Sequence, residues 1–183
     1  MVFSTWLLFV VGCLGALDIA LYHSLSHGIR SHPDSRWELV THSLRGPTYA
    51  LLFLVVPNFS LQGWWFGALA ALLVLDVAIS LVDFALERKS RLFFDGLPSG
   101  EYVLHSIIAM VFGAMCASIV FEGGHGFREV TMIAYVPAEV PTVLRAVFVV
   151  MAALVLASGI QDAFAVVRLS RVPDRAPDLA GHE

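Results

Sequence analysis

The chain has 183 residues, of which 58% are hydrophobic and only 14% are charged, and its mean hydropathy is +0.79. A soluble domain needs more charge than this to cover its surface, so the composition excludes an ordinary soluble protein and predicts an integral membrane protein. The formal net charge of −4 says little about partners, and nothing in the sequence indicates nucleic-acid binding.

Five segments are apolar over about 20 residues, the length that a helix needs to cross a bilayer. They are continuously apolar rather than alternating, which favours helices over a β-barrel. The segments cover residues 3–27, 37–56, 64–86, 102–121 and 143–167. We therefore expect an all-α integral membrane protein, a bundle of five transmembrane helices that forms one domain over residues 1–169. The polar remainder, residues 170–183, is predicted to be a disordered cytoplasmic tail.

Two pairs of matching sequences predict an internal repeat. Residues 38–44 are E-L-V-T-H-S-L and residues 101–107 are E-Y-V-L-H-S-I. Upstream of each copy, L-D-I-A-L around Asp18 matches L-D-V-A-I around Asp76. We interpret these matches as a tandem two-helix unit, with copies at about residues 3–57 and 64–121 and an additional helix at about 142–168. The copies would share one orientation, related by an axis along the membrane normal.

Positive charge predicts the orientation of the bundle in a cell membrane. Eight of the eleven Lys and Arg residues fall on one side of the predicted helices. These eight are Arg30, Arg36, Arg88, Lys89, Arg91, Arg168, Arg171 and Arg175. By the positive-inside rule the N-terminus is outside and the C-terminus is in the cytoplasm.

Polar residues of the first four helices are predicted to meet near the cytoplasmic face, where helices 1 and 3 end and helices 2 and 4 begin. At about 1.5 Å of rise per residue, one layer holds His23, His42, Asp83 and His105. A layer about one turn nearer the surface holds His27, Glu38, Glu87 and Glu101, and Asp18 with Asp76 lies about two turns deeper. The spacing of four in 23/27, 38/42, 83/87 and 101/105 places each pair on one helix face.

These histidines and carboxylates predict a metal centre, because ionisable groups at such depth in a membrane are costly and usually functional. Mixed His and carboxylate ligands suit iron, zinc or manganese. The predicted ligands are His23, His27, Glu38, His42, Asp83, Glu101 and His105. We expect Asp18, Asp76, Glu87, Arg45 and Asp162 around them, as partners of the ligands or as further ligands.

The predicted ligands resemble those of two classes of metalloprotein. Carboxylates and histidines from four helices resemble the site of bundle di-iron proteins, with Glu-x-x-x-His here in place of their Glu-x-x-His. The spacing His23-x-x-x-His27 resembles one histidine box of the membrane fatty-acid hydroxylases and desaturases, whose adjacent-His boxes are absent from this sequence. The number of carboxylates slightly favours iron, and with iron the chemistry would be oxygen-dependent.

Three functional hypotheses follow. The first is a membrane oxidoreductase with a dinuclear site, two iron ions or else zinc or manganese, which hydroxylates or desaturates a lipid or another lipophilic substrate. Glu38 and Glu101 would be its catalytic carboxylates, and it would need an electron donor. The second is an electron carrier that binds haem b through His42 and His105. The third is a zinc hydrolase, or a metal- or proton-coupled transporter that would require an oligomer, since five helices are few for a transport path.

Overall fold

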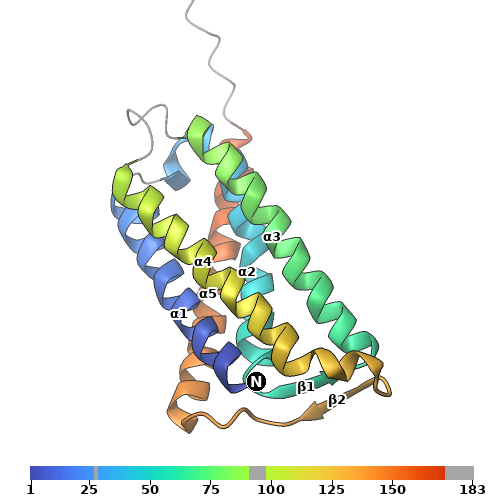
Figure 1. Cartoon of the computed structure of the whole chain (residues 1–183). Coiled ribbons are helices and arrows are strands. Elements are labelled where there is room, and N and C mark those ends of the chain that lie inside the picture. The colour runs from blue at the N-terminus through green and yellow to red at the C-terminus, as the bar shows by residue number, and fades with distance from the viewer. Residues whose placement is uncertain (27–28, 91–97, 172–183) are drawn as a thin grey trace, which may run out of the picture.

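The computed structural model describes the backbone of residues 1–26, 29–90 and 98–171, and the side chains of these residues except 24–26 and 88–90. Five long helices dominate it (Figure 1): α1 Val2–Asp18, α2 Arg36–Val55, α3 Trp64–Ser90, α4 Ser99–Gly123 and α5 Thr142–Leu169. The predicted all-α class is confirmed. The tandem repeat and the division into one domain and a tail stay predictions.

Short helical turns lead from α1 to α2. A π-helix, η1 Ile19–Ser26, continues α1 without a break, and two 3₁₀ turns follow, η2 Ile29–Ser31 and η3 Pro33–Ser35. Pro98 and Pro141 directly precede α4 and α5. Proline suits these positions, because amides at a helix start have no partner within the helix, so the missing proline N–H costs nothing.

Two short strands join the loops at the end of the bundle that holds the N-terminus (Figure 1). Strand β1, Phe59–Gln62, pairs antiparallel with β2, Met132–Tyr135. Gly63 then turns the chain into α3 with a φ of 57°. A side chain at Gly63 would also collide with Thr131, so glycine is required there for two reasons.

Helix α2 lies at the centre of the packing. It runs along α5 and also contacts α3, whereas α1 packs mainly against α4. Helices α2 and α5 approach each other closely at Gly46 and Gly159, where a Cβ on Gly46 would lie 3.0 Å from the Cα of Gly159. Small residues at such crossings allow the backbones of membrane helices to come together. Leu52 and Phe148, from the same two helices, are fully buried in the core.

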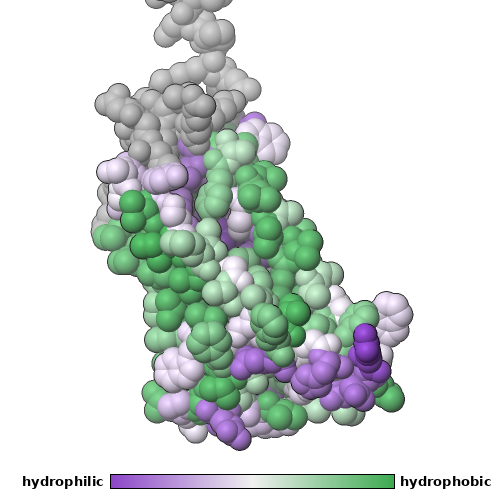
Figure 2. All heavy atoms as spheres, in the orientation of Figure 1, coloured by the Kyte–Doolittle hydropathy of each residue, from purple (hydrophilic) through white to green (hydrophobic). Residues whose placement is uncertain are grey.

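Four helical segments of the described chain are long and apolar enough to cross a membrane. They are Val2–His23, Trp64–Glu87, Ser99–Arg128 and Thr142–Leu169. Many large apolar side chains are exposed on these segments, and green areas cover much of the face that Figure 2 shows. The remaining predicted span corresponds to α2, which carries Arg36, Glu38 and Arg45 and is largely covered by its neighbours. A fifth crossing and the orientation of the bundle therefore stay predictions.

Candidate metal centre

The π-helix η1 brings Asp18 and His23 together at the end of α1. In a regular α-helix, residues five apart point in different directions, but a π-helix bonds i to i+5 and aligns them. The Nε2 atom of His23 lies 3.3 Å from Oδ2 of Asp18. Sequence spacing instead predicted a pair with His27, whose side chain lies outside the described residues.

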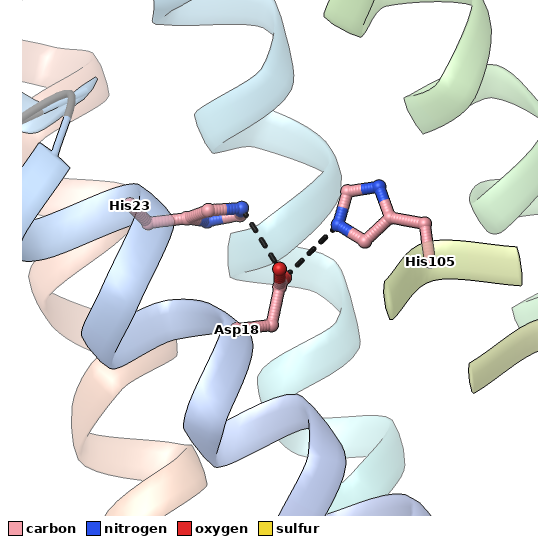
Figure 3. Close-up of side chains that lie close together, drawn as sticks. All are labelled: Asp18, His23 and His105. Carbon is pink, nitrogen blue, oxygen red and sulfur yellow. Dashed lines mark hydrogen bonds and ion pairs between the residues drawn. The ribbon is translucent and has the colours of Figure 1, made fainter. Parts of the chain in front are cut away.

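The same carboxylate oxygen of Asp18 also meets a histidine from α4. Its Oδ2 is 3.1 Å from Nε2 of His105, so that the carboxylate lies between two imidazole rings (Figure 3). The depth estimate from sequence placed Asp18 about two turns below the histidines. The two side chains nevertheless meet, because the π-helix places Asp18 and His23 on the same face of the helix.

A second carboxylate faces the other nitrogen of His105. Its Nδ1 lies 3.1 Å from Oε1 of Glu87 on α3. A neutral imidazole has one donor nitrogen and one acceptor nitrogen. A ring with a carboxylate at both nitrogens therefore needs either a second proton or a cation between one nitrogen and its carboxylate. Phe84 stacks on the ring and fixes its plane.

Helix α2 contributes Glu38 and His42. The ring of His42 stacks on that of His23 with 4.6 Å between centroids, and its Nε2 lies 3.5 Å from Oδ2 of Asp83. The hydroxyl of Thr41 donates to the other oxygen of Asp83. Asp83 thus lies beside His42, in the position of a carboxylate that orients a ligand histidine.

Three groups of donor atoms result, each with its atoms within 4.8 Å of one another. The groups are Asp18 with His23 and His105, His23 with Glu38 and His42, and Glu87 with Glu101 and His105. Because His23 and His105 each belong to two groups, the three form one continuous cluster. Glu38 and Glu101 are 2% and 0% exposed, so neither is the solvated helix-terminal carboxylate that their positions near helix starts would allow.

The structure therefore brings together five of the predicted ligands, His23, Glu38, His42, Glu101 and His105. Asp18 and Glu87, expected only around the ligands, also belong to the donor groups. Asp83 belongs to none of these groups and contacts His42 instead. Which of these residues bind a metal stays a prediction.

Two arginines pair with three further buried carboxylates beside the cluster. Arg45 lies between Asp76 and Asp83, with 3.5 Å from its Nε to Oδ1 of Asp76 and 3.7 Å from its Nη1 to Oδ2 of Asp83. Arg30 pairs with Asp162 through Nε and Oδ1 at 2.6 Å. Sequence reasoning missed the role of Arg30, because a loop arginine is counted only as a signal of the predicted topology. Arg30 and Asp162 are 132 residues apart in the sequence, so no local sequence pattern could reveal the pair.

A cavity of about 830 Å³ opens from the cluster into the bundle. Its polar end is formed by His23, His42 and His105, and the remainder is mainly apolar. Figure 2 shows hydrophilic atoms between the apolar surfaces in the upper half of the molecule. The arrangement thus combines a cation-binding set of side chains with space for an apolar molecule.

Comparison of the chain with protein-family models, with curated proteins and with solved structures finds no match. Function is therefore inferred from buried histidine and carboxylate groups that could hold a metal, in a bundle with four helices that could cross a membrane.

Proposed function

We propose that the protein is an integral membrane metalloprotein with a dinuclear site near the cytoplasmic membrane face. The observation that carries the proposal is the sharing of His23 and His105 among three donor groups. His23, Glu38 and His42 would hold one metal ion, and Glu87, Glu101 and His105 would hold the other. Asp18, whose carboxylate lies between His23 and His105, would bridge the two ions.

The charge of the donor groups would suit two cations. Asp18, Glu38, Glu87 and Glu101 would carry four negative charges, and all four are buried. A buried carboxylate is costly unless a cation compensates it. Two divalent ions with neutral imidazole ligands would offset all four charges. The two described arginines near the cluster lie beside three other carboxylates, those of Asp76, Asp83 and Asp162.

The fold we propose around this site has five membrane-spanning helices, with α2 as the fifth. Its charged residues would not face lipid, since α2 lies among α3, α5 and the turns between α1 and α2. Ionisable residues within membranes typically face the bundle interior and mark functional sites. The N-terminus outside and the C-terminus in the cytoplasm complete the topology.

The chemistry we propose is oxygen-dependent hydroxylation or desaturation of a lipophilic substrate, with iron as the metal. In hydroxylation, one atom of dioxygen enters a C–H bond and the other leaves as water, with two electrons and two protons from a donor. Glu38 and Glu101 would act as ligands and proton carriers, and Asp83 would hold the His42 ring. Carboxylate-rich sites favour iron or manganese over a purely structural zinc site.

The haem hypothesis has less support. A haem between His42 and His105 would need a free nitrogen on each ring directed at a common centre. His42 instead stacks against His23, and both nitrogens of His105 face carboxylates. Haem binding would also give the donor groups around Glu38 and Glu101 no role.

The experiment is metal analysis of the purified protein together with an optical spectrum. We expect about two metal ions per chain and no Soret band. His23→Ala and His105→Ala should each lose metal, because each residue belongs to two donor groups. His125→Ala is the matched control, since His125 is exposed in the turn after α4. A metal-free protein, or a Soret band, would contradict the proposal.

A further inference from the structure

The large cavity runs lengthwise through half of the bundle. Phe53 on α2 and Met151 on α5 line its apolar end, whereas His42 and Asp162 on the same helices line its polar end. Eleven residues separate the two ends on each helix, which corresponds to about 16 Å at 1.5 Å of rise per residue. The hydrocarbon core of a bilayer is roughly 30 Å thick, so the cavity has the depth of one leaflet.

Small residues create this space. A Cβ atom added at Gly15 of α1 or at Gly113 of α4 would meet no atom within 4 Å, and both glycines line the cavity. Protein interiors are otherwise close-packed. An apolar cavity does not hold water well, and its volume lies within the range of ligand pockets. The occupant must therefore be apolar, narrow and long.

The cavity is open to the side. Val77, Leu81 and Phe84 of α3 line it and are also exposed on the outer surface of the bundle, with Leu81 64% exposed. Helices α3 and α4 make few contacts with each other along their described lengths. A molecule in the surrounding lipid could therefore enter between these two helices without crossing water.

We infer that the cavity binds one acyl chain of a membrane lipid, with its polar end at the histidine–carboxylate cluster and its methyl end near Phe53 and Met151. An acyl chain in one leaflet has this length and direction, whereas the polyisoprenoid tails of quinones are longer than one leaflet. This inference rests on the proposed function. It implies that the bonds near the polar end of the acyl chain are the ones that react.

The test uses the full chain in phospholipid vesicles that contain one of two photoreactive phosphatidylcholines. One carries a diazirine at the methyl end of an acyl chain, and the other carries it close to the ester. We expect the first probe to label Phe53 or Met151, and the second to label His42 or His105, which line the polar end of the cavity. The reverse pattern, or labelling of outward-facing residues alone, would overturn the inference.

A variant that fills the cavity makes the test specific. Gly15→Phe should reduce labelling inside the cavity by about tenfold or more, since each displaced methylene loses burial energy. Gly113→Leu serves as a second variant if Gly15→Phe does not fold. The control is Gly124→Phe, because Gly124 lies outside the cavity and its nearest neighbour would be Val120 at 3.7 Å. Unchanged cavity labelling in both filled variants would contradict the inference.

Metal content, measured on the same samples, separates the two proposals. Metal retained in the wild type without cavity labelling would refute the acyl-chain inference and leave the metal centre intact. Cavity labelling in a protein that binds no metal would refute the proposed function, while the lipid-binding cavity would stand. We expect Gly15→Phe to keep its metal, since Gly15 belongs to none of the donor groups.

Discussion

The ion pair between Arg30 and Asp162 provides an asymmetric prediction about stability. Its two partners differ in burial, since the side chain of Arg30 is 31% exposed and that of Asp162 only 5%. Arg30 also donates to the hydroxyl of Ser158. If Asp162 loses its charge, Arg30 can still reach water. If Arg30 is lost, a carboxylate stays buried without its cation.

The magnitudes follow from this difference. Asp162→Asn should reduce the free energy of unfolding by about 2 kcal/mol, the usual value for a hydrogen bond to a charged group. Arg30→Met should cost about 3–5 kcal/mol, as for other buried charges that lose their partner. The double variant should then be more stable than Arg30→Met alone, because its second substitution removes the buried charge.

The assay is reversible unfolding in mixed detergent micelles, followed by circular dichroism in the presence of a chelator. The chelator removes any contribution of metal binding to stability. The reasoning is refuted if Arg30→Met costs no more than Asp162→Asn, or if the two effects simply add in the double variant. Additivity would show that the two side chains do not depend on each other.

Two further predictions concern the cluster and the helix packing. Asp18→Asn keeps the size of the side chain but removes the charge beside His23 and His105, so affinity for one metal ion should fall by about 10–100-fold or more. Metal titration checks this, with the exposed Asp34→Asn as control. An unchanged affinity would exclude Asp18 as a bridge. Gly46→Leu should destabilise the bundle by about 3 kcal/mol, because its Cβ would lie 3.0 Å from the backbone of α5. Gly15→Ala, which meets no atom within 4 Å, should leave unfolding unchanged, and equal effects at both glycines would disprove the close approach.

The helices and the meeting of their polar ends could be predicted from sequence, because both depend on regular periodicity. Apolar runs of about 20 residues define the four candidate spans, and regular α-helices place Glu38 with His42 and Glu101 with His105. Glu38 and His42 do belong to one donor group, and Glu101 and His105 belong to another. The contact between Asp18 and His23 could not be predicted in this way, since periodicity cannot reveal a π-helix that changes which residues share a face.

Other features depend on contacts distant in sequence. Strands β1 and β2 have four residues each and lie in loops, so neither carries a recognisable strand pattern. The pairing of Arg30 with Asp162 joins a loop to α5. Asp83 contacts a histidine of α2, whereas Glu87 contacts a histidine of α4, and no spacing along α3 could show this division.

X-ray absorption spectroscopy of the metal-loaded protein tests the central claim most directly. We predict nitrogen and oxygen ligands around each metal ion, together with scattering from a second metal at about 3.5–4 Å, as in other two-metal sites. A single isolated metal ion without a metal neighbour, or a porphyrin-like set of four nitrogens, would contradict the dinuclear centre.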